Sequence, residues 1–170
     1  MKRQTILVTL PLLLAQLLSA VQAQGAVKSA APKGGCIELT TVAQQEKSVT
    51  AADGTVTKKY VPAARIVPDT EVVWTTTARN LCKKPAENVV IDQPVPEHMI
   101  FVADSTSGTD AQVTLATNGD EFMPAKDLTV SVAGVVRHAS AADVRHVRWT
   151  LNKAVAPQST VTVRYRATLQ

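Results

Sequence analysis

The stretch VRHVRWTLNKAVAPQSTVTVRYRATL, residues 144–169, decides the fold class of this chain. Within residues 144–151, polar and apolar side chains alternate from His146 to Leu151, and the same alternation returns along residues 160–168. Strict alternation gives a strand one buried and one solvated face, as in antiparallel sheets. The stretch therefore predicts two β-strands, with Trp149 on the buried face of the first and Tyr165 on that of the second.

The chain upstream of this stretch has the composition of further short strands. From Cys36 onward, runs rich in valine, threonine and isoleucine are separated by proline, glycine, asparagine and aspartate. Asp53-Gly54 and Asn118-Gly119 supply the positive φ angles that tight hairpin turns need. The remaining strands are expected at residues 36–42, 46–50, 55–60, 71–80, 88–92, 98–102, 111–117, 121–124 and 128–136.

These strands and the lack of any helical pattern of ten or more residues predict an all-β domain. About eight to ten short strands, with turn residues between them, are typical of an immunoglobulin-like antiparallel β-sandwich. A β-barrel is the alternative. In residues 71–80, Trp74 alternates onto one face with Val72, Thr76 and Ala78, so we expect Trp74 to anchor the core.

The amino end has the pattern of a secretory signal. Lys2 and Arg3 precede an apolar run, and Val21-Gln22-Ala23 provides a small-residue cleavage site. The alternative is a retained membrane anchor, but a run of about sixteen residues is short against the roughly 20 that span a bilayer. We therefore expect a signal peptide at residues 1–23, a flexible linker at 24–35 and one domain at 36–170.

Signal removal fixes the expected compartment and charge of the mature protein. A periplasmic or secreted, cell-surface location follows, with no integral membrane segment after cleavage. Loss of Lys2 and Arg3 reduces the 18 basic residues to 16, against 14 acidic residues. This balance is too even to indicate nucleic acid as the partner.

The sequence holds two cysteines, Cys36 and Cys82. In an oxidising compartment a lone pair of cysteines favours one disulfide, which would join the first strand of the domain to the end of the Trp74 strand. Two free, buried thiols are the alternative. A redox-active pair is disfavoured, because catalytic disulfide chemistry uses a close Cys-x-x-Cys spacing.

Two blocks carry a resemblance to a known family. The first is VVWTTTARN, residues 72–80, followed by PAENVVIDQPVPEHMIFVADSTSG, residues 85–108, and the second is residues 144–169. Together they resemble the conserved-repeat β-sandwich family called domain of unknown function eleven, found in bacterial cell-surface and exported proteins. The resemblance implies a β-sandwich outside the cytoplasm. The chain has one copy, with Leu81 and Cys82 where the family usually has glycine.

The residue types that catalyse reactions or bind metals form no recognisable motif. The three histidines, His98, His138 and His146, match no ligand spacing, and neither a zinc site nor a resident cofactor is predicted. No serine lies in a Gly-x-Ser-x-Gly elbow, and no catalytic residue is assigned. A loop calcium site is conceivable, although ordinary turn chemistry explains the same acidic residues: Asp104, Asp110, Asp120 and Glu121.

Arginines concentrate in the last two predicted strands. If these strands are adjacent and antiparallel, Arg148, Arg164 and Arg166 share a solvated face that could bind an anionic surface polymer or lipid headgroups. The alternative is an ordinary solvated face whose arginines pair with carboxylates of a neighbouring strand.

The sequence thus favours a non-enzymatic, exported structural or protein-binding module that contacts another envelope or surface protein. Recognition is expected through exposed strand edges, for example at residues 94–96, because Pro94 and Pro96 cannot donate ladder hydrogen bonds and mark an edge. The rival interpretation is a ligand-binding or hydrolytic domain, which requires a concave pocket where carboxylates or His98 converge.

Overall fold

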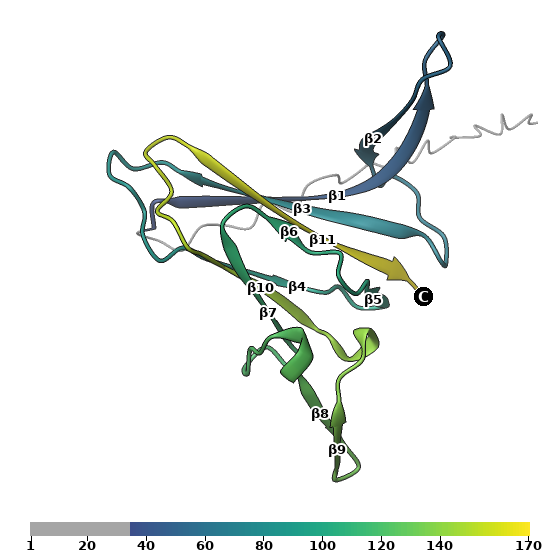
Figure 1. The fold of residues 1–170 in the computed structure, drawn as a ribbon, viewed down its shortest axis with the longest axis vertical. Coiled ribbons are helices and arrows are strands. Elements are labelled where there is room, and N and C mark those ends of the chain that lie inside the picture. Colours follow the sequence, from purple (N-terminus) through teal and green to yellow (C-terminus); the bar gives the residue numbers. More distant parts are fainter. Residues whose placement is uncertain (1–34) are drawn as a thin grey trace, which may run out of the picture.

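The computed structural model describes residues 35–170 of the chain, which form two facing antiparallel β-sheets and a projecting hairpin (Figure 1). The prediction of an all-β antiparallel sandwich is confirmed. The expected signal peptide and residues 24–34 of the expected linker lie outside the described residues. Within residues 35–170, no helix has the length and apolar character to cross a membrane.

The larger sheet has the strand order β2-β1-β3-β11-β5, with β6 also beside β11. All its pairings are antiparallel. Beyond Gln44, β1 leaves β3 and continues with β2 as a two-stranded arm that extends from the sandwich (Figure 1). The strands are β1 (Ile37–Thr50), β2 (Val56–Pro62), β3 (Glu71–Asn80), β5 (Met99–Phe101), β6 (Ser107–Gly108) and β11 (Thr160–Leu169).

The smaller sheet places β10 (His146–Leu151) between β4 (Val90–Pro94) and β7 (Ala111–Ala116). A separate hairpin, β8 (Thr129–Val132) with β9 (Val135–His138), projects from this layer (Figure 1). Two short 3₁₀ turns flank the hairpin, η1 (Ala125–Asp127) before it and η2 (Ala141–Asp143) after it.

An aromatic core joins the two sheets. Trp149 of β10 is 0% exposed and Tyr165 of β11 is 1% exposed, with ring centroids 6.3 Å apart. Trp74 stacks on Tyr165 at 6.4 Å, so it lies on the core face as expected, although it is only partly buried. The Tyr165 hydroxyl donates to the Pro94 carbonyl of β4 at 2.8 Å, which satisfies its polar end within the core.

The expected disulfide between Cys36 and Cys82 is present. It joins the start of β1 to the residues that follow β3, next to the buried Asn80. The Asn80 amide nitrogen donates to the carbonyls of Lys84 and Val155, and its oxygen accepts from the Cys82 N–H. These bonds fasten two loops to the end of β3: the loop that follows β3 and the loop that contains Val155.

The prediction of one buried strand at residues 128–136 is wrong. Ala133 and Gly134 adopt positive φ angles of 51° and 82° and turn the chain between β8 and β9. Val135 and Val136 are 67% and 68% exposed, because no second layer covers this hairpin. The apolar composition that suggested burial therefore lies on the surface.

Other strand boundaries also differ. The two runs expected at 36–42 and 46–50 form the single strand β1, because residues 43–45 keep pairing with β3 or β2. Residues 121–124 make only an isolated bridge between Met123 and Leu115. The two strands of the 144–169 stretch belong to different sheets, since β10 pairs with β4 and β7 whereas β11 pairs with β3 and β5.

Candidate functional site

Hydrogen bonds close one long side of the sandwich. On this side, β1 is the outer strand of the larger sheet at Thr41, and β4 is the outer strand of the smaller sheet at Gln93, within residues 35–170. The Thr41 hydroxyl lies 2.9 Å from that of Thr76 and donates to the Gln93 side-chain oxygen at 3.2 Å. The chain of bonds runs from β3 through β1 to β4 and links the two sheets.

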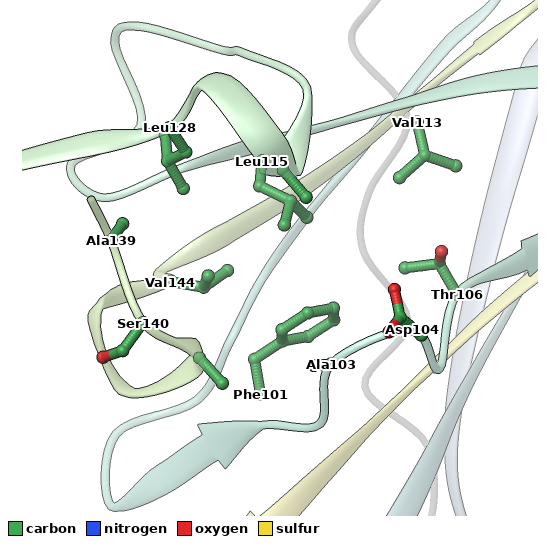
Figure 2. Close-up of a pocket in the computed structure, with 12 residues that line it drawn as sticks. Phe101, Ala103, Asp104, Thr106, Val113, Leu115, Leu128, Ala139, Ser140 and Val144 are labelled. Atoms are coloured by element: carbon green, nitrogen blue, oxygen red, sulfur yellow. The ribbon is translucent and has the colours of Figure 1, made fainter.

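The opposite side, between β5 and β7, holds a pocket of about 320 Å³ (Figure 2). This volume is at the lower end of the range for ligand pockets. Core side chains form its floor, and η1, η2 and the base of the β8–β9 hairpin form one wall. The lining is mostly apolar and consists of Phe101, Ala103, Asp104, Thr106, Val113, Leu115, Ala125, Leu128, Ala139, Ser140, Ala141 and Val144.

The pocket has an apolar end and a polar end. Figure 2 shows Leu128 and Val144 at one end, with Asp104 and Thr106 near Val113 at the other. Asp104 sits in a tight turn with a φ of 56°, a left-handed conformation that aspartate tolerates better than most residues. In the described part of the chain, no basic side chain forms an ion pair with its carboxylate.

Part of β7 beside this pocket has no partner strand. The Asn152 N–H donates to the Asp110 carbonyl, so backbone alternation turns Gln112 toward β10 and turns Ala111 and Val113 away from it. Leu115 also turns outward but bonds to Met123. Ala111 and Val113 therefore each present an N–H and a carbonyl that no other strand of residues 35–170 uses.

The β5 side of the pocket has a similar edge. The Val102 N–H donates to the Arg166 carbonyl, and alternation then points the backbone groups of Phe101 away from β11. The pocket thus opens between two strand edges, one from each sheet. Sequence reasoning missed it, because its lining comes from several separate segments and no periodic pattern links them.

The structure does not bring the three predicted arginines onto one face. Arg148 lies on the outer face of the smaller sheet, whereas Arg164 and Arg166 lie on the outer face of the larger sheet. The predicted patch required β10 and β11 to be adjacent, and they belong to different sheets. The crossing between the sheets at residues 152–159 separates them.

Two of the three arginines are neutralised by carboxylates. Arg148 donates to Asp92 at 2.7 Å, and Arg166 bonds to both Glu71 and Glu46. These contacts raise the pKa of Arg166, with Glu71 the larger cause. They match the alternative of arginines paired with neighbouring strands.

Glu46 and Arg164 lie near Arg166 on the outer face of the larger sheet. Hydrogen bonds from Lys58 and then Arg166 hold the pKa of Glu46 below its usual value. Arg164 donates to the Thr75 hydroxyl at 3.2 Å and lies over the Tyr60 ring at 5.6 Å. Arg164 has no carboxylate partner within residues 35–170, but its guanidinium is held against β2 and β3.

The histidines do not converge. His98 and His138 are exposed, at a turn and at the end of β9, and lie outside the lining of the pocket. His146 Nδ1 lies 3.1 Å from Asp92 Oδ1, a contact that resembles part of a catalytic dyad. The loop that contains Gly119 lies against the other ring nitrogen, since a Cβ added at Gly119 would lie 2.9 Å from His146 Nε2. This loop therefore covers the nitrogen that would have to activate a nucleophile.

The acidic turn residues are likewise spread apart. Asp110 pairs with Lys153 at 2.8 Å, and the Asp120 N–H bonds to the Asn118 side chain in the manner of an Asx turn. Within residues 35–170, no three histidine, cysteine or acidic side chains group closely enough to hold a metal ion. Asp104 alone of these residues reaches the pocket.

The segment at 94–96 offers little to a partner strand. Pro94 and Pro96 have no N–H, and the Val95 N–H already donates to the Arg145 carbonyl. The Pro94 carbonyl accepts from Tyr165. Since strand addition needs alternating donors and acceptors, the edges beside the pocket suit it better than this one.

The chain matches no protein-family model, and comparisons with curated proteins and with solved structures find no similar protein.

Proposed function

We propose that this protein is a non-enzymatic, exported β-sandwich that binds another protein of the bacterial envelope or cell surface. The signal pattern of residues 1–23 supports export, and the Cys36–Cys82 disulfide is compatible with an oxidising compartment. The resemblance to the cell-surface sandwich family supports an envelope location. Periplasmic and surface-exposed locations are both consistent with these features.

One observation carries the binding role: an apolar pocket opens between two unpaired strand edges. Exposed edges are a hazard for a secreted β-protein, because they can pair with any extended chain. Native β-proteins commonly cover or blunt such edges. A partner that covers the open side would use the same edges for recognition.

The arrangement of polar groups favours binding over hydrolysis. The Asp92–His146 contact lies on the outer face of the smaller sheet, away from the pocket lining. The pocket contains one carboxylate, Asp104, whereas glycoside hydrolysis uses a pair of carboxylates.

Site-specific photo-crosslinking in intact cells tests this proposal. A photoreactive phenylalanine analogue replaces Ala103, which is exposed at the pocket, and in a control replaces Thr150, which is exposed on β10. We expect a discrete adduct from position 103 and none from position 150. Adducts from position 150 alone, or from neither position, would contradict recognition through the open side.

A further inference from the structure

We infer that the open side binds an extended peptide that pairs with β7 and carries an apolar side chain two residues away from a lysine or arginine. This inference rests on the proposed protein-binding function and specifies the ligand class of the same site. Backbone hydrogen bonding, pocket shape and charge each contribute a separate part of the argument.

The backbone of β7 selects a polypeptide. Ala111 and Val113 present two N–H groups and two carbonyls in one row, spaced two residues apart. A strand laid beside them supplies donors and acceptors at the same spacing of about 6.6–6.8 Å. An acyl chain or a small aromatic molecule could fill the pocket but would leave this row unpaired.

The pocket selects one apolar side chain of the peptide. Its volume of about 320 Å³ lies at the lower end of the range for binding sites, which suits a single large side chain rather than a long ligand. Phe101, Leu115 and Leu128, all less than 9% exposed, provide its apolar surface. A leucine or phenylalanine anchor would remove this surface from water.

The Asp104 carboxylate at the polar end of the pocket favours a basic side chain on the peptide. Asp110 is paired with Lys153 and Asp143 with Arg137, while Asp104 has no ion-pair partner within residues 35–170. Residues i and i+2 of a strand share one face. A peptide whose apolar anchor fills the pocket can therefore direct a basic side chain at position i+2 along the same face, toward the Asp104 end.

NMR titration of the ¹⁵N-labelled domain with synthetic peptides tests the inference. The reference probe is acetyl-Thr-Thr-Leu-Thr-Lys-Thr-amide, and two variants replace its leucine with alanine or its lysine with glutamate. We expect shifts centred on the amides of Ala111 and Val113, loss of binding with the alanine probe, and two- to fivefold weaker binding of the glutamate probe, the range of exposed ion pairs.

A protein variant isolates the charge contribution. Asp104→Asn should remove the preference for lysine over glutamate, whereas Asp120→Asn, an exposed acid outside the pocket lining, should keep it. Both substitutions are at exposed positions, so folding is expected to be unchanged. Equal affinity of the lysine and glutamate probes for the unmodified domain would overturn the charge assignment.

N-methylated probes isolate the strand pairing. Successive N–H groups of a strand point to opposite edges, so methylating one alternate set of probe nitrogens should weaken binding at least threefold more than methylating the other. Equal effects would overturn pairing with β7. Crosslinks from position 103 without peptide binding would remove this inference alone, and peptide binding without crosslinks would instead remove the proposed cellular function.

Discussion

Replacement of Asn80 by alanine should be among the most destabilising single changes in the domain. Asn80 is 0% exposed, and its side chain makes three hydrogen bonds of 2.8–2.9 Å to Lys84, Val155 and Cys82. The alanine variant loses all three bonds. It also leaves the Lys84 carbonyl and the Cys82 N–H without this partner, whereas the Val155 carbonyl keeps its bond to the Ala86 N–H.

The expected loss follows from the number of bonds. Each hydrogen bond contributes about 1 kcal/mol net, so the three together give about 3 kcal/mol. In urea, a slope of about 1–3 kcal/mol per molar converts this loss into a midpoint shift of about 1–3 M. Asn80→Asp should be at least as destabilising at neutral pH, because it places a carboxylate against the carbonyls of Lys84 and Val155.

Equilibrium urea unfolding of the oxidised domain, followed by tryptophan fluorescence, measures the shift. Asn152→Ala is the matched control, since Asn152 is exposed and such surface changes usually stay within about 0.5 kcal/mol. If the two alanine variants unfolded at the same urea concentration, the role assigned to the Asn80 side chain would be refuted.

Three further predictions concern stability. Reduction of the Cys36–Cys82 disulfide, which spans 46 residues, should cost about 4 kcal/mol, visible as an earlier urea midpoint; no change would contradict it. Gly108→Ala should cost about 1–3 kcal/mol in the same assay, because its Cβ would lie 2.9 Å from Val163; unchanged stability would show that the contact relaxes freely. Burial raises the pKa of Tyr165, so its contribution to stability is complete below pH 10 and is lost above it; ultraviolet titration should then show one tyrosine ionising only on unfolding, and two freely ionising tyrosines would contradict burial.

Alternation along strands made most of the fold predictable. Residues 160–168 alternate strictly, and residues 71–80 place Val72, Trp74 and Ala78 on one face; the two runs form most of β11 and β3, side by side in the larger sheet. The disulfide was also predictable, since two cysteines allow a single pairing. Alternation defines which side chains share a face, but it does not say which sheet a strand joins.

Because alternation does not assign a strand to a sheet, it could not show that Arg148 lies apart from Arg164 and Arg166. Arg148 and Arg164 lie on consecutive strands, and a short loop favours pairing between such neighbours. Here residues 152–159 cross from one sheet to the other instead, as connections in a sandwich do. The packing of Trp149 against Tyr165 from opposite sheets fixes this crossing, and it depends on contacts between distant segments.

The exposed β8–β9 hairpin and the pocket were missed for different reasons. The apolar run around Val132 and Val135 suggested a buried strand, although the Ala133-Gly134 pair between them was a usable turn signal. The pocket had no such signal. Asp104 and Leu128 line the same pocket only because β5, β7 and the hairpin base converge, which local sequence does not encode.

Hydrogen exchange at the β7 edge tests the central claim most directly. In the isolated domain, the amides of Ala111 and Val113 should exchange rapidly, while those of Gln112 and Thr114, which face β10, should be protected. Addition of the leucine–lysine peptide should slow exchange at Ala111 and Val113. Protection of these two amides before any peptide is added, or no change after it, would contradict an open edge that recognises a partner.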